Sequence, residues 1–188
     1  MNEVLKAIRE RRSVRVFSDA PVSGEELDAI LDAALYAPSA MNTQASHVTA
    51  VRGLGRIAEL TDALKEASRQ PGFDRYRDYV GQETYTVNFL KAPLFLIVGA
   101  DRTRSFCPRE DGSMVMANIL LAAHALGLGA VWINQLGPAA DEPGFRKLLT
   151  SLGFPETHLI VGCAAVGRRE GANPPAPPRI GGRFNVIS

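Results

Sequence analysis

A short basic segment near the start of the chain carries the highest density of potentially reactive side chains. Residues 9–17 read Arg-Glu-Arg-Arg-Ser-Val-Arg-Val-Phe, with four arginines and a serine among nine positions. In an extended backbone, alternation directs Arg11, Ser13 and Arg15 to one side. Two guanidinium groups and a hydroxyl on one face suit an anion, in particular a phosphate group. A solvated basic turn explains the same residues, and taken alone they favour that simpler interpretation.

A second polar stretch follows a predicted helix and reads Pro38-Ser39-Ala40-Met41-Asn42-Thr43-Gln44. The proline prevents the helix from continuing. Ser39 and Ala40 are small, so a ligand can approach the backbone closely. Asn42 and Gln44 offer uncharged donors and acceptors. The stretch therefore has the features of a loop that could bind a ligand.

Together the two stretches resemble the nitroreductase family of flavoproteins. Members of this family carry an Arg-x-Ser-x-Arg/Lys segment near the start, followed by Pro-Ser-x-x-Asn-x-Gln. The matching residues here are Arg11, Ser13 and Arg15 in the first motif, and Pro38, Ser39, Asn42 and Gln44 in the second. The similarity continues through residues 118–133 and extends into the C-terminal tail.

The resemblance implies an α+β fold in which helices flank a central mixed, mostly antiparallel sheet. It also implies an intertwined homodimer with an FMN at each of two interface sites. The expected activity is ping-pong transfer: NADH or NADPH delivers hydride to flavin N5, and a small planar nitroaromatic or quinone-like acceptor then takes the electrons. The cofactor carries this chemistry, so no catalytic side chain is implied. A flavin-binding or sensing protein without efficient turnover is the alternative, because it needs the same residues.

The resemblance also implies roles for individual side chains. Arg11 and a tail arginine, either Arg179 or Arg183, would hold the FMN phosphate, and Ser13 would bond the phosphate or the ribityl chain. Arg15 would face the pyrimidine edge of the flavin, where a fixed positive charge stabilises the reduced anion. The remaining candidates for cofactor binding are Arg12, then Pro38, Ser39, Ala40, Asn42 and Gln44 from the second subunit, and Ile133, Asn134 and Gln135 at a strand end.

The sequence departs from the family pattern at two places besides the ambiguous tail arginine. Ala45 and Ser46 follow Gln44, where the family usually has Pro-Trp. Where many members place an asparagine against the flavin, this chain has Tyr85, with Asn88 nearby. The first departure concerns packing, whereas the second bears on substrate preference.

Length and composition indicate one soluble domain of 188 residues, with residues from about 168 to 188 forming an extended arm. The formal charge of +1 makes a nucleic-acid surface the weakest interpretation of the basic segment. Two cysteines form neither a disulfide framework nor a metal motif, which favours a reducing compartment. We expect neither a signal peptide nor a membrane span, so the predicted location is cytoplasmic.

Hydrophobic periodicity predicts the elements that must position these residues. A capping box at Ser23-Gly24-Glu25-Glu26 begins a helix that Pro38 ends. Further helices are predicted at residues 56–68, 111–126 and 145–152, and strands at residues 47–51, 94–100, 130–134 and 158–166. Helix 111–126 is apolar nearly all round, so it must be buried in the core or against another chain. Residues 70–90, in which Phe73, Tyr76, Tyr79 and Tyr85 lie among charged residues, fit either a lid over a flat ligand or an ordinary amphipathic helix.

Overall fold

Four strands form the central sheet of the computed structural model, which describes residues 2–69 and 91–187. The strands are β1 (Ser46–Arg52), β2 (Leu94–Asp101), β3 (Gly129–Ile133) and β4 (His158–Gly167). Their order is β1-β2-β4-β3, and every pairing between them is antiparallel. A parallel bridge between Ser13 and Ala130 extends the sheet at its β3 edge. The expected mixed, mostly antiparallel sheet is therefore confirmed.

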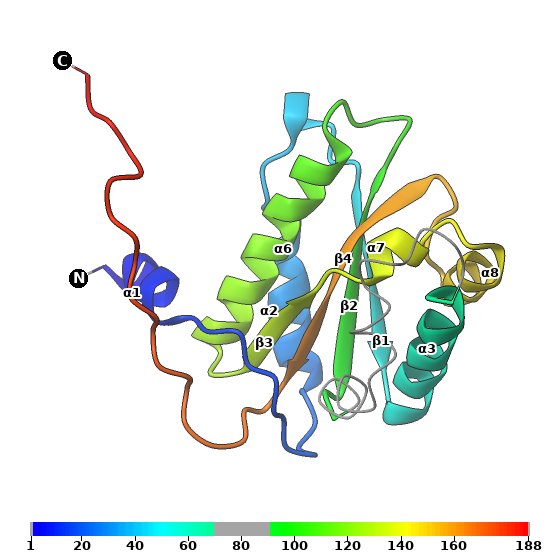
Figure 1. The fold of residues 1–188 in the computed structure, drawn as a ribbon, viewed down its shortest axis with the longest axis horizontal. Helices are drawn as coiled ribbons and strands as arrows, with labels where there is room; N and C mark the ends of the chain where they lie inside the picture. The colour runs from blue at the N-terminus through cyan, green and yellow to red at the C-terminus, as the bar shows by residue number, and fades with distance from the viewer. Residues whose placement is uncertain (1, 70–90, 188) are drawn as a thin grey trace.

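Helices cover both faces of this sheet (Figure 1). One face carries α2 (Gly24–Leu35) and α6 (Pro108–Ala125), and the other carries α3 (Leu54–Ala67), α7 (Leu136–Ala139) and α8 (Pro143–Ser151). The short helix α1 (Glu3–Glu10) lies beyond the sheet edge, beside the C-terminal end of α6. The expected α+β class is confirmed.

Alternation along β2 supplies both halves of the hydrophobic core. All eight residues of this strand are buried. Phe95 and Ile97 pack with α3, α7 and α8, whereas Leu94, Leu96 and Val98 pack with α2 and α6. A continuous apolar run is what a strand covered on both faces requires, and the prediction for residues 94–100 is confirmed.

The helix predicted after Ser23 begins and ends where its local signals place it. Ser23 Oγ accepts a hydrogen bond from Glu26 N at 3.1 Å, and the Glu26 carboxylate accepts one from Ser23 N at 2.8 Å. This reciprocal pair is the capping box. The helix ends at Leu35, three residues before Pro38.

The remaining predicted helices and strands are also confirmed, with boundaries that differ by a few residues. Helix α7 was not predicted: it has four residues, which include Gly137 and Pro138, and is too short to show a period. The hypotheses for residues 70–90, including those on Tyr85 and Asn88, fall outside the described residues.

The C-terminal arm leaves β4 and passes α1 without regular secondary structure (Figure 1). Arg168 pairs with Glu26 at 2.7 Å, and Asn173 Nδ2 donates to the carbonyl of Glu10 at 2.9 Å. These contacts fix the first part of the arm to α2 and α1. Among the described residues, no helix is long and apolar enough to cross a lipid bilayer.

Candidate functional site

The first motif lies along the exposed edge of β3. Val14 N donates to the carbonyl of Ala130 at 3.1 Å, next to the bridge between Ser13 and Ala130. Gly129 permits this close approach, since a Cβ atom there would stand 2.6 Å from Val14 Cγ1. Val14 is buried, whereas Ser13 is half-buried and Arg15 exposed. The segment is thus anchored by its apolar residue and presents its polar ones outward.

Arg11 is one of two half-buried cations in this segment, together with Arg12. Its Nη1 atom is buried and has no hydrogen-bond partner among the described residues. Burial and the neighbouring guanidinium groups of Arg12 and Arg179 lower the pKa of Arg11. A buried donor without a partner is costly, and like charges beside it add to that cost. An anion bound here would relieve both penalties.

Arg12 lies beside Arg11 but is partly occupied by the protein itself. Its Nη1 donates to the carbonyls of Arg9 and Arg11, both at 2.7 Å, and so satisfies oxygens at the end of α1. Its Nε atom is buried and unpaired within the described part of the chain. Arg15 Nη1 lies 3.5 Å from the carbonyl of Ser13, a long contact that leaves its guanidinium exposed. Of the three residues expected on one face, Arg11 and Ser13 are half-buried and Arg15 is exposed, and the charges of Arg12 and Arg179 act on Arg11.

Two further basic side chains, His124 and Arg169, accompany these arginines. The sequence analysis did not single out either of them as a ligand. His124, in the last turn of α6, has its pKa lowered by burial and further by Arg11 and Arg169, against the opposing effect of Glu10. Arg169 is the second residue after the end of β4. The tandem of Arg168 and Arg169 at a strand end was the available signal, although such a pair is weakly specific. We call Arg11, Arg12, Arg169, Arg179 and His124 the cationic cluster.

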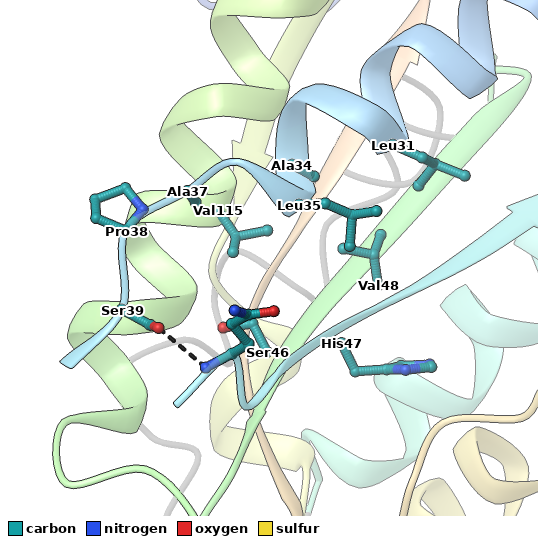
Figure 2. Close-up of a pocket in the computed structure, with 11 residues that line it drawn as sticks. Leu31, Ala34, Leu35, Ala37, Pro38, Ser39, Ser46, His47, Val48 and Val115 are labelled. Carbon is teal, nitrogen blue, oxygen red and sulfur yellow. Dashed lines mark hydrogen bonds between the residues drawn. The ribbon is translucent and has the colours of Figure 1, made fainter. Parts of the chain in front are cut away.

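The second motif forms a tight loop between α2 and β1, with a 3-10 turn (η1, Ala40–Asn42). Ser39 Oγ accepts a hydrogen bond from Gln44 N at 3.0 Å (Figure 2), and Asn42 N donates to the carbonyl of Ser39 at 3.0 Å. Met41, Asn42 and Gln44 have φ values of 52°, 54° and 48°, in the left-handed region. Three such residues without glycine are a strained arrangement, and strain of this kind clusters at functional sites.

A cavity of about 440 Å³ lies behind this loop (Figure 2). Its lining consists of Leu31, Ala34, Leu35, Ala37, Pro38, Ser39, Gln44, Ser46, His47, Val48 and Val115. Most of these side chains are apolar and come from α2, β1 and α6. Such a wall suits an apolar side chain or ring.

The third group of candidates lies where β3 ends. Ile133 is the last residue of the strand and is 3% exposed, while Asn134 is exposed. Gln135 precedes α7 and is half-buried. This strand end therefore lies on the β3 edge of the sheet, where Ser13 also pairs.

The first two motifs lie at opposite ends of α6 (Figure 1). Asp111, in its first turn, accepts a hydrogen bond from Ala40 N, whereas His124, in its last turn, belongs to the cationic cluster. The two residues are 13 positions apart, which corresponds to about 20 Å along the helix at about 1.5 Å per residue. One chain therefore does not bring its own two motifs to a single contact point.

Metal-ligating and thiol side chains were also located in the described residues. There, no three metal-ligating side chains are grouped as a metal site would require. Cys163 is fully buried, and its burial raises the pKa of the thiol far above its ordinary range. It packs as a small core residue, as expected.

Comparisons with known proteins agree with this geometry. The nitroreductase family model matches residues 8–168. A protein of Archaeoglobus fulgidus whose name includes the words NAD(P)H nitroreductase is 33% identical over 171 residues, covering 89% of this chain and 86% of that protein. A crystal structure of a nitroreductase with bound FMN from Bacteroides fragilis matches with a TM-score of 0.92 and 35% identity, covering 100% of each chain. A second, from Desulfitobacterium hafniense, matches with a TM-score of 0.84 and 29% identity at the same coverage. With the motifs, the fold and these matches in agreement, the chain belongs to the nitroreductase family.

Proposed function

We propose that this protein is a cytoplasmic FMN-dependent NAD(P)H oxidoreductase that acts as a homodimer and reduces nitroaromatic or quinone-like acceptors. The single observation that carries this proposal is the unpaired, buried Nη1 of Arg11 within the cationic cluster. Family members related to this chain hold FMN in their solved structures. The cluster offers the donors that the phosphate group of FMN requires.

Within the cluster, Arg11 and Arg179 hold the phosphate. Of the two tail arginines, Arg179 is favoured because its charge acts on Arg11. Ser13 bonds the phosphate or the ribityl chain, and Arg12 contributes charge while its Nη1 remains on the end of α1. Arg15 is exposed beside them, as a residue facing the pyrimidine edge of the flavin must be.

The second half of the site comes from another copy of the chain. The opposite ends of α6 separate the cationic cluster from the loop of residues 38–44, so a partner must supply that loop. The surface around α1 is a candidate for the contact between the two copies. Val4, Leu5 and Ile8 on α1 are 64%, 54% and 52% exposed, and an apolar groove of about 330 Å³ lies between α1, α2 and α6. An apolar stripe of this kind marks an association surface.

Bound FMN would supply the redox chemistry, namely hydride acceptance at N5 and electron transfer to the acceptor. The protein supplies binding, orientation and charge. Residues from both copies would border the flavin ring: Pro38, Ser39, Ala40, Asn42 and Gln44 of one copy, and Ile133, Asn134 and Gln135 of the other. Arg15 favours the reduced ring by placing a positive charge beside it.

Purification and anaerobic stopped-flow absorbance test this proposal. The protein should be yellow, and NADH or NADPH should bleach the flavin band before menadione or nitrobenzene restores it. Protein that stays colourless after incubation with FMN refutes the proposal. Yellow protein that neither nicotinamide bleaches is the flavin-binding or sensing alternative, which uses the same binding residues without turnover.

A further inference from the structure

Asp111 is a buried carboxylate in the first turn of α6, 4% exposed, and it contacts the loop of the second motif. Its Oδ1 accepts a hydrogen bond from Ala40 N at 2.8 Å. Its Oδ2 accepts one from Ser105 Oγ at 2.6 Å, and Ser105 Oγ in turn accepts one from Cys107 N at 3.0 Å. The positive end of the helix dipole also favours a negative side chain at this position.

The loop that Asp111 contacts adopts a backbone conformation that its residue types do not prefer. Met41, Asn42 and Gln44 all adopt left-handed φ values. Residues other than glycine remain in this region only where surrounding contacts enforce it. Among the described residues, two side chains outside the loop bond to its backbone: Asp111 accepts from Ala40 N in the first half, and Arg104 Nη2 donates to the carbonyl of Thr43 at 3.3 Å in the second half.

We propose that Asp111 is a positioning residue for flavin binding: by holding Ala40 N, it keeps Ser39 and Asn42 in the conformation that contacts the flavin of the partner subunit. This inference rests on the proposed function. Asp111 acts on the loop, which borders the ring, and not on the phosphate. Loss of the Asp111 carboxylate should therefore weaken the binding of FMN and of riboflavin equally. A change in the cationic cluster should weaken the binding of FMN alone.

Comparing a conservative with a disruptive substitution of Asp111 distinguishes a positioning role from a general effect on stability. In Asp111→Asn, the amide oxygen can still accept from Ala40 N, and the amide nitrogen can donate to Ser105 Oγ. In Asp111→Ala, both partners lose their acceptor. Asp101→Ala is the matched control, because Asp101 is also buried and accepts two hydrogen bonds, from Thr103 N at 2.8 Å and Thr103 Oγ1 at 2.7 Å.

The test titrates flavin-free, full-length protein with FMN and with riboflavin by fluorescence quenching. Asp111→Ala should bind both about tenfold more weakly, the effect of one lost buried hydrogen bond. Asp111→Asn should stay within about threefold of the unmodified protein, and so should Asp101→Ala. Ser105→Ala, which keeps the carboxylate, should give an intermediate loss and serves if Asp111→Ala does not fold.

Amide hydrogen exchange of the flavin-free protein gives an independent readout. Exchange in the peptide covering residues 36–46 should rise in Asp111→Ala and stay unchanged in Asp101→Ala. Unchanged flavin affinity in Asp111→Ala, an equal loss in Asp101→Ala, or a loss for FMN without one for riboflavin overturns the inference. If the unmodified protein binds neither flavin, the proposed function fails, and the exchange result alone decides whether Asp111 holds the loop.

Discussion

Replacing Arg11 by alanine should lower the affinity for FMN while leaving the flavin-free protein at least as stable as before. The Nη1 atom of Arg11 is buried and unpaired, and its burial together with Arg12 and Arg179 lowers its pKa, so the fold opposes this charge. A hydrogen bond to a charged group contributes about 1.5–3 kcal/mol. Losing one such bond to phosphate therefore weakens FMN binding about 10- to 150-fold.

Riboflavin provides the matched probe because it lacks the phosphate. Fluorescence titrations should give an unchanged dissociation constant for riboflavin in Arg11→Ala and a raised one for FMN. Thermal unfolding of the flavin-free variant should show an equal or higher midpoint. Arg56→Ala, which removes an exposed arginine paired with Glu59 on α3, should change neither affinity. Equal losses for both flavins, or a lower midpoint without flavin, would refute the reasoning.

Two predictions concern stability. Gly129→Ala should lower the free energy of unfolding in urea by about 1–3 kcal/mol, because its Cβ would stand 2.6 Å from Val14 Cγ1. The control Gly55→Ala, in α3, meets open space and should not destabilise the protein. Equal unfolding midpoints for the two variants would contradict this. Burial lowers the pKa values of His47 and His158, so between those values and about 6.5 the unfolded chain binds more protons than the folded one. The free energy of unfolding should therefore fall as pH drops below about 6.5, and replacing both histidines by asparagine should flatten that fall; stability that rises from pH 7 to 5.5 would show the sign to be wrong.

Local signals were sufficient for most of the helices and strands. The capping box at Ser23 and Glu26 and the apolar run from Leu94 to Ala100 each depend on neighbouring residues, and both predictions are confirmed. The role of Arg12 at the end of α1 depends on which way its side chain turns back. That direction is set by the exit of the chain from the helix, which no spacing rule describes.

Long-range features could not be obtained in this way. Asp111 acts on Ala40, 71 residues earlier in the chain, and nothing in its own sequence neighbourhood indicates a loop partner. Likewise, Arg179 is preferred over Arg183 only once the arm is traced past α1 and its charge is seen to act on Arg11. The left-handed φ values of Met41 and Asn42 are a tertiary effect as well, because neither residue type demands them.

If the protein is the homodimer proposed above, with each pocket shared between two copies, the length of α6 has a consequence for mixtures of defective chains. If one copy carries a damaged cationic cluster and the other a damaged loop of residues 38–44, a dimer formed from both concentrates the two lesions in one pocket. The opposite pocket then receives its phosphate-binding half and its loop from undamaged segments. Two inactive variants refolded together should complement each other, which neither could do if each polypeptide built a complete pocket by itself.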